Sequence, residues 1–316
     1  MPNYKLELKN LTVTALPAKK ILVKNVSLGV AEEGVTAILG QSGSGKTTIC
    51  LSVLGLLPQG LDITGEILLR RGKSSLDILR MKEGELHELR GKKVAITFQE
   101  PRRYMNPVIK CGEQLMDLVD GSRKEKLQKA IELLETVRFE RPMVIFNKYP
   151  FELSGGQAQK FSLALALSKK PAILLADEPT TGLDYESKKD LAMIYNDQIE
   201  KNGLSIFLVT HDVYFAHRIA DFVGVIFNGY LLEFGSKKEI FSDPFHPYTK
   251  QLIEATSLDR LFSMGNELWD YNFSLRSDGC IFSRSCKYSM PECFKNEPPE
   301  YRTEERMVRC FLFSRG

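Results

Sequence analysis

Residues 153 to 184, LSGGQAQKFSLALALSKKPAILLADEPTTGLD, constrain the fold of this chain more than any other segment. A Ser-Gly-Gly turn precedes an apolar stretch that predicts a helix, and Pro171 ends it. A short apolar strand, Ala172 to Ala176, follows and leads into two carboxylates, Asp177 and Glu178. A strand that follows a helix and ends in polar groups is typical of a parallel sheet, in which ligands bind at the carboxyl ends of the strands.

The same alternation of strands and helices continues along the chain. Helices are predicted from Lys46 to Leu57, before Pro58, and from about Tyr185 to Asn202, where Gly203 supplies a stop. The first forty residues alternate apolar and polar positions, which predicts antiparallel strands. Further buried strands are predicted at Val35–Leu39, Val94–Phe98, Leu204–Val209 and Phe222–Phe227. We therefore expect an α/β fold with a mostly parallel sheet, covered on both faces, and an antiparallel β subdomain.

Two segments differ in character from this alternation. From about residue 100 to 165 the pattern is helical, with a capping box at Ser122 and Glu125, and we interpret it as a helical insertion. Within it, Met143 to Phe146 fits no element clearly. After residue 242 the periodicity fades and Pro, Cys and aromatic residues increase. The predicted domains are therefore 1–242 and a small Cys-rich C-terminal extension, 243–316.

Composition excludes several classes of protein. The chain has 316 residues, 43% of them hydrophobic, and a formal net charge of +3 with acids and bases interleaved. Without a basic stripe, we expect no nucleic-acid binding. The longest apolar runs are strand-length, well short of the ~20 residues that a membrane span needs. The N-terminus has no signal-peptide pattern, so we expect a cytosolic chain, and any membrane-spanning helices must come from another chain.

A glycine-rich loop follows the strand Val35–Leu39 and opens a helix, which is the context that identifies a P-loop. Its glycines let backbone N–H groups turn toward phosphates, and the helix N-terminus favours negative charge. We expect Lys46 to neutralise the β- and γ-phosphates and the Thr47 hydroxyl to ligate Mg²⁺. A turn without a ligand is disfavoured, because strand, helix, Lys and Thr are all in register. The candidate nucleotide-binding residues are Gly40, Gln41, Ser42, Gly43, Ser44, Gly45, Lys46, Thr47 and Thr48.

The carboxylates at the end of the 172–176 strand fit the same chemistry. We expect Asp177 to hold the Mg²⁺ shell, as such aspartates do in P-loop NTPases. We expect Glu178 to orient or deprotonate the attacking water. A pair of carboxylates that merely caps a helix is the competing interpretation, and the P-loop upstream makes it the weaker one.

The Ser-Gly-Gly-Gln turn predicts a second anion site. Ser154 can cap the helix that follows, and Gly155 and Gly156 leave its N–H groups uncovered by side chains. Two phosphate cradles are more than one ATP requires within a single domain.

Together these motifs resemble those of the nucleotide-binding subunits of ATP-binding-cassette (ABC) transporters, over about residues 5 to 240. The resemblance implies a P-loop NTPase of RecA-like fold that hydrolyses ATP with Mg²⁺. It implies that Gln99 reaches the metal and the water, and that His211 hydrogen-bonds the γ-phosphate and positions the water. It also implies a head-to-tail dimer, with a sister chain or a second copy, in which these residues close on the partner's ATP: Ser154, Gly155, Gly156, Gln157 and Asp184.

One position departs from the family. Its members place an aromatic residue some twenty-odd residues before the P-loop to stack on adenine, where this chain has Leu16, Pro17 and Ala18. Adenine is then expected to pack against aliphatic side chains or against Tyr4.

The tail carries a further resemblance. Residues 243–250, DPFHPYTK, and the cysteines after them are similar to the tail of oligopeptide, dipeptide and nickel importer ATPases. The resemblance implies a 4Fe–4S cluster on Cys280, Cys286, Cys293 and Cys310. The spacing of these cysteines by itself leaves a cluster, zinc, and free or disulfide-bonded thiols open, although no C-x2-C pair of a zinc ribbon is present.

The function implied is the ATP-hydrolysing subunit of an importer, at the cytoplasmic face of the cell membrane. Its partners would be a second ATPase subunit, two transmembrane permeases and an extracytoplasmic substrate-binding protein, and peptides, nickel and oligosaccharides remain open as substrates. The alternative is a non-transport iron–sulfur ABC ATPase that acts on ribosomes or nucleic acid. A nucleotide-binding regulator without turnover conflicts with Glu178 and His211.

Overall fold

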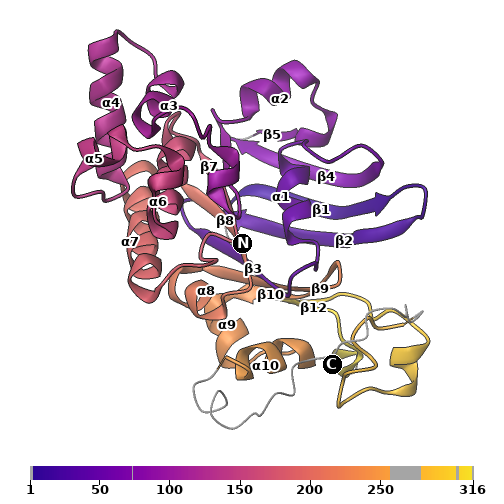
Figure 1. Cartoon of the computed structure of the whole chain (residues 1–316). Helices are drawn as coiled ribbons and strands as arrows, with labels where there is room; N and C mark the ends of the chain where they lie inside the picture. Colours follow the sequence, from indigo (N-terminus) through magenta and orange to yellow (C-terminus); the bar gives the residue numbers. More distant parts are fainter. Residues whose placement is uncertain (1–2, 73, 257–278, 304–305, 315–316) are drawn as a thin grey trace.

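The computed structural model of the chain describes residues 3–72, 74–256, 279–303 and 306–314. A continuous sheet runs through the molecule, with helices on its faces and the C-terminal extension at one end (Figure 1). The strand order is β5-β4-β1-β2-β10-β9-β3-β8-β7-β6. The α/β architecture is confirmed, and the sheet is mixed, with a parallel half and an antiparallel half.

One half of the sheet, which ends at the edge strand β6, is parallel, because β9, β3, β8, β7 and β6 pair in that direction. Nearly every residue of these strands is buried, which explains their continuous apolar runs. The predicted strands are correct to within about one residue at each end. Their bounds are β3 Val35–Leu39, β6 Val94–Thr97, β7 Ile173–Asp177, β8 Ser205–Thr210 and β9 Phe222–Phe227.

The predicted antiparallel strands form as β1 (Tyr4–Ala15) and β2 (Lys20–Ala31). Two strands that the pattern did not predict, β4 (Leu61–Arg71) and β5 (Ser74–Asp77), extend this subdomain. A short helix, α2 (Glu83–Leu89), follows them.

Helix α1 (Lys46–Val53) is shorter than predicted, because the chain turns before it reaches Pro58. The segment that we interpreted as an insertion contains several helices, and the capping box of Ser122 and Glu125 is confirmed at the start of one of them. The unassigned residues Met143–Phe146 lie in a short helix. The helices are α3 Cys111–Leu118, α4 Arg123–Thr136, α5 Pro142–Asn147 and α6 Gly155–Leu167. Short 3-10 turns lie at Ile78–Arg80, Pro101–Tyr104, Pro150–Glu152, Pro291–Phe294 and Phe311–Phe313.

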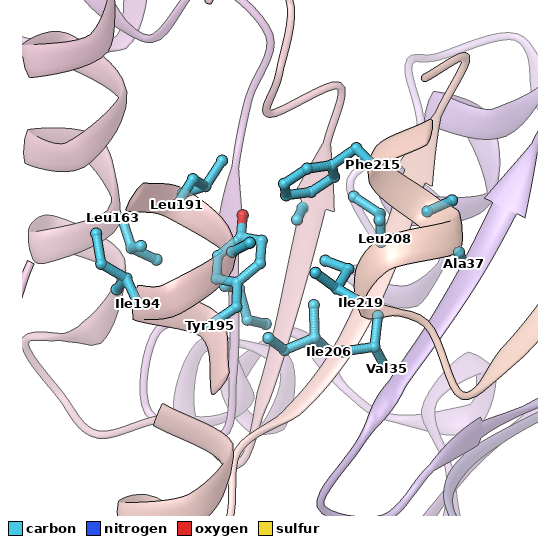
Figure 2. Packing of buried hydrophobic residues seen from close by; sticks show 14 of the residues in the cluster. Val35, Ala37, Leu163, Leu191, Ile194, Tyr195, Ile206, Leu208, Phe215 and Ile219 are labelled. Carbon is cyan, nitrogen blue, oxygen red and sulfur yellow. The ribbon is translucent and has the colours of Figure 1, made fainter. Parts of the chain in front are cut away.

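Helices α7 (Tyr185–Asn202) and α8 (Val213–Ile219) bury the sheet on one side. Figure 2 shows Tyr195 of α7 and Phe215 of α8 facing one another over the strand residues Ile206 and Leu208. The rings of Tyr195 and Phe215 are 6.3 Å apart and meet edge to face. Gly203 ends α7 in the left-handed conformation, as predicted.

The C-terminal extension joins the same sheet. After β10 (Tyr230–Ser236), α9 (Lys237–Ser242) and α10 (Pro247–Glu254), the chain returns in the strands β11 (Tyr301–Arg302) and β12 (Met307–Val308). Strand β12 pairs with β10. Glu233 in β10 is fully buried and accepts hydrogen bonds from Arg306 (2.6 Å) and from the backbone N–H groups of Phe245 and His246. A buried carboxylate with charged and backbone donors on both sides fixes the extension to the cassette.

Among the described helices, none has both the length and the apolar character that crossing a membrane requires.

Candidate functional site

A hollow of about 220 Å³ opens at the carboxyl ends of the parallel strands. Most of the predicted loop lines it, together with Gln99 from the end of β6 and Glu178 from the end of β7. The loop residues that line it are Ser42, Gly43, Gly45, Lys46, Thr47 and Thr48. The sheet topology therefore brings together motifs that lie more than a hundred residues apart in the sequence.

Lys46 occupies the bottom of this pocket, with its side chain only 5% exposed. Its ammonium donates to the carbonyl oxygens of Gly40 (2.7 Å) and Gln41 (2.9 Å) and lies 3.2 Å from Glu178 Oε1. The loop thus folds back on its own lysine. The ammonium is held at the place where a phosphate would bring compensating negative charge.

Asp177 lies beneath the loop and is nearly fully buried. The Thr47 hydroxyl donates to its Oδ1 over 3.1 Å. Burial raises the pKa of the Asp177 carboxyl, and the hydrogen bond from Thr47 acts against this shift. Two of the three side chains predicted to hold Mg²⁺ are therefore in contact, and a cation between them would favour the ionised carboxylate.

Glu178 follows Asp177 in a left-handed backbone conformation (φ 48°), which is rare for a residue with a side chain. This turn directs the carboxylate toward His211. Glu178 Oε2 lies 2.7 Å from His211 Nδ1 and also accepts from the His211 backbone N–H (3.2 Å). The Thr210 hydroxyl donates to the same oxygen over 3.3 Å. A carboxylate held by a histidine on one side and a lysine on the other is a suitable base for a water molecule next to a phosphate.

The Ser-Gly-Gly-Gln turn lies outside this pocket. Ser154 caps α6, and its capping box with Gln157 is reciprocal: Ser154 Oγ accepts from Gln157 N–H (3.2 Å), and Gln157 Oε1 accepts from Ser154 N–H (3.1 Å). Ser154, Gly156 and Gln157 line a separate hollow of about 370 Å³. Asp184 caps α7 by accepting from Ser187 N–H (2.7 Å), and this hydrogen bond lowers its pKa. The chain therefore does not bring Asp184 or this turn to its own P-loop.

The four tail cysteines lie close together. Every pair of their thiols interacts electrostatically, and no disulfide joins any of the four. Burial raises the pKa of Cys280 to about 12 and that of Cys310 to about 11. Cys280, Cys286 and Cys310 each accept a hydrogen bond from the backbone two residues later, and the Met290 N–H donates to Cys293 Sγ over 3.4 Å.

No group of three or more His, Cys, Asp or Glu side chains in the described part of the chain is arranged to hold a metal ion. A tetrahedral zinc site brings its thiolates to within about 3.8 Å of one another, because each Zn–S bond is about 2.3 Å long.

Four residues of the pocket were not predicted from the sequence. Lys20, Ile21 and Leu22 at the start of β2, with Asn228 in the turn after β9, line the pocket beside the loop. Ile21 and Leu22 belong to an ordinary alternating strand, so no sequence signal distinguishes them. Tyr4, the aromatic alternative for adenine, lines a different hollow, in contact with β2 residues farther along the strand.

Comparisons with known proteins agree with this geometry. Residues 23–181 match the ABC transporter family, and residues 232–293 match the C-terminal region of oligopeptide/dipeptide transporters. The chain is 35% identical to the dipeptide transport ATP-binding protein DppD of Caldanaerobacter subterraneus subsp. tengcongensis, over 92% of this chain and 91% of that protein. It is 34% identical to the oligopeptide transport ATP-binding protein AppD of Bacillus subtilis, over 98% and 96% of the two chains.

Among solved structures, it is similar to the ATP-binding cassette MJ0796, determined as a dimer in a post-hydrolysis state with ADP and Pi. The TM-score is 0.64 at 27% identity, and the match covers 73% of this chain and 98% of that one.

Proposed function

The chain belongs to the ATP-binding subunits of ABC transporters, and we propose that it powers the import of short peptides through partner membrane permeases. It is an ATPase of this family. The observation that carries the catalytic assignment is the ion pair of Lys46 with Glu178 in one pocket, with His211 in contact with Glu178. Thr47 lines the same pocket and contacts Asp177. Peptide import is supported by the match of residues 232–293 to the tail of oligopeptide/dipeptide transporters.

Each residue has a role in this proposal. Lys46 and the loop amides bind the β- and γ-phosphates, and Thr47, Asp177 and Gln99 complete the shell of Mg²⁺. Glu178 takes the proton of the attacking water, and His211 holds Glu178 and the γ-phosphate in place. Mg²⁺ would supply neutralisation of the charge that develops on the phosphates.

The second phosphate cradle serves a partner subunit. Ser154 to Gln157 present a capped helix N-terminus at the surface, away from the chain's own P-loop, and Gly155 lies against the turn at Gly182. A partner's γ-phosphate would complete this site in a head-to-tail dimer, with either a sister chain or a second copy. The cassette would then associate with two permeases at the cytoplasmic face of the membrane. An extracytoplasmic binding protein would deliver the substrate to these permeases.

The experiment that tests the function is co-expression of the chain with the permeases and partner ATPase encoded in its own genome. We expect a complex whose ATP turnover rises when the binding protein delivers its ligand. The ligand that raises turnover identifies the substrate and separates peptides from nickel and oligosaccharides. Salt-dependent association with ribosomes or nucleic acid, without any permease, would instead favour the non-transport ATPase.

We further propose that Cys280, Cys286, Cys293 and Cys310 hold a 4Fe–4S cluster. Two observations support this: the thiols are mutual neighbours, and each sulfur accepts a backbone hydrogen bond. A 4Fe–4S cluster binds four thiolates, one at each iron. Its role would be to cross-link the extension, since ATP hydrolysis involves no electron transfer.

Protein purified without oxygen is expected to be brown and to contain iron and acid-labile sulfide in about equal amounts. Replacing Cys293 with serine should reduce both contents strongly. The matched control is Cys111→Ala, since Cys111 is a buried cysteine of α3 outside the site. Colourless protein without iron or sulfide would contradict the cluster, and stoichiometric zinc in its place would favour a single ion.

A further inference from the structure

The nucleotide pocket has a wall that the phosphate loop does not supply. This wall consists of Lys20, Ile21 and Leu22 of β2 and Asn228 of the β9–β10 turn. If the loop binds the phosphates, this wall is the part of the pocket left for the nucleoside. Within the described part of the chain, no aromatic ring lines this pocket. Ile21 and Leu22 are half-buried and apolar, whereas Lys20 and Asn228 are exposed to solvent.

This wall is fixed against the phosphate loop. A Cβ atom built on Gly45 would lie 2.7 Å from the Leu22 carbonyl oxygen, and one built on Gly229 would lie 2.5 Å from it. Only glycines therefore allow β2 to approach so closely. The Gly229 N–H donates to the carbonyl of Ser44 (3.0 Å), and its own carbonyl accepts from the Lys24 N–H (2.9 Å).

The C-terminal extension also contacts strand β2, at residues next to this wall. Arg309 donates to the carbonyl oxygen of Asn25 in β2 over 2.6 Å. Glu297 accepts from the Tyr230 hydroxyl over 3.1 Å and forms an ion pair with Lys24. Strand β2 thus pairs with β1 and β10 and also contacts the extension. These contacts fix the positions at which Ile21 and Leu22 line the pocket.

Tyr4, the aromatic residue nearest to this strand in the sequence, packs away from the pocket. The ring of Tyr4 covers Gly29, where a Cβ atom would lie only 2.3 Å from the ring. The same ring meets Phe222 edge to face at 6.0 Å. Tyr4 therefore packs between β2 and β9 and cannot stack on a base without breaking this cluster.

We infer that the pocket recognises its nucleotide through the phosphates and contacts the base only through the apolar side chains of Ile21 and Leu22. The ligand class is then nucleoside triphosphates, with weak preference for adenine over guanine. Apolar contact distinguishes poorly between two purines of similar size, because strong discrimination needs buried donors and acceptors that the wrong base leaves unpaired. The polar groups on this wall, Lys20 and Asn228, are exposed, so water competes for their hydrogen bonds. This inference rests on the proposed ATPase function.

The test is calorimetric titration of the full chain with ATP, with GTP and with inorganic triphosphate. We expect the dissociation constants of ATP and GTP to agree within about threefold. Ile21→Tyr adds a ring to the wall and should tighten ATP and GTP binding by about tenfold, since stacking of a base on an aromatic ring is worth about that factor. Leu127→Tyr, on the exposed face of α4, is the matched control and should change neither constant.

Inorganic triphosphate reports on the loop alone, so its affinity should be the same in the wild type and in Ile21→Tyr. A loss of triphosphate affinity in that variant would mark a misfolded pocket, and Ile21→Ala then takes its place, with weaker binding of both nucleotides expected. A preference for ATP over GTP of more than tenfold in the wild type would overturn the inference and leave the ATPase function intact. Failure of both nucleotides and of triphosphate to bind would overturn the proposed function itself.

Discussion

Replacing Glu178 with glutamine is expected to lower ATP turnover by about 10²- to 10⁴-fold, the usual range for loss of a general base. Glutamine keeps the shape of the side chain and can still accept from His211, but it cannot take a proton from water. Lys46 contacts the Gly40 and Gln41 carbonyls independently of Glu178, so the phosphate cradle should survive. ATP affinity is therefore expected to stay within about threefold of the wild type, because binding and chemistry use different groups.

Single-turnover hydrolysis and ATP titration of the same preparation measure the two effects separately. Glu132→Gln is the matched control, because Glu132 is an exposed carboxylate on α4, far from the pocket in sequence. That control should leave turnover unchanged. Near-normal turnover of Glu178→Gln would show that another group activates the water.

Replacing Lys46 with alanine is expected to weaken ATP binding by about 100-fold, because two charge-assisted hydrogen bonds to phosphate are lost. The effect should be smaller for ADP, which has no γ-phosphate. The free energy of unfolding should also fall, because Lys46 and Glu178 are both nearly buried and the variant leaves the carboxylate without its lysine.

Lys20→Ala is the control for Lys46→Ala, since Lys20 lines the same pocket but is exposed. Its effect on ATP affinity should stay below about threefold. Titration calorimetry measures both affinities, and denaturant unfolding measures the stability. Equal losses in the two variants would show that the pocket attracts ATP by its overall charge, without a specific contact to Lys46.

The catalytic residues could be located from the sequence because each belongs to a local pattern. The P-loop is a strand, a glycine turn and a helix within the nineteen residues from Val35 to Val53, and Asp177 and Glu178 end a continuous apolar strand. Parallel strands align their carboxyl ends, so predicting the strands also predicts that Gln99, Glu178 and the loop lie together. The pocket confirms that grouping.

The parts that could not be predicted depend on contacts between distant segments. Strands β4 and β5 lie at the edge of the sheet, where half-exposed residues give no continuous apolar run. Strand β12 has only two residues, and it is a strand because β2 pairs with β10 only at Tyr230 and leaves Glu233 and Phe234 to pair with β12. Likewise, the pairing of Arg306 with Glu233 joins residues 73 positions apart, which no local pattern encodes.

The sequence by itself determined the motifs on which the proposed chemistry rests: a P-loop, a carboxylate pair and a histidine at strand ends, and a Ser-Gly-Gly-Gln turn that caps a helix. These follow from patterns of a few residues, because turns, caps and strand ends are set by local backbone geometry. Only the tertiary structure decided which residues line the pocket beside the loop, where Tyr4 packs and how the cysteine-bearing extension is attached. Those outcomes depend on how β2, β9, β10 and the tail pack together. In a close-packed interior, the position of each segment depends on all the segments around it, so no local pattern encodes it.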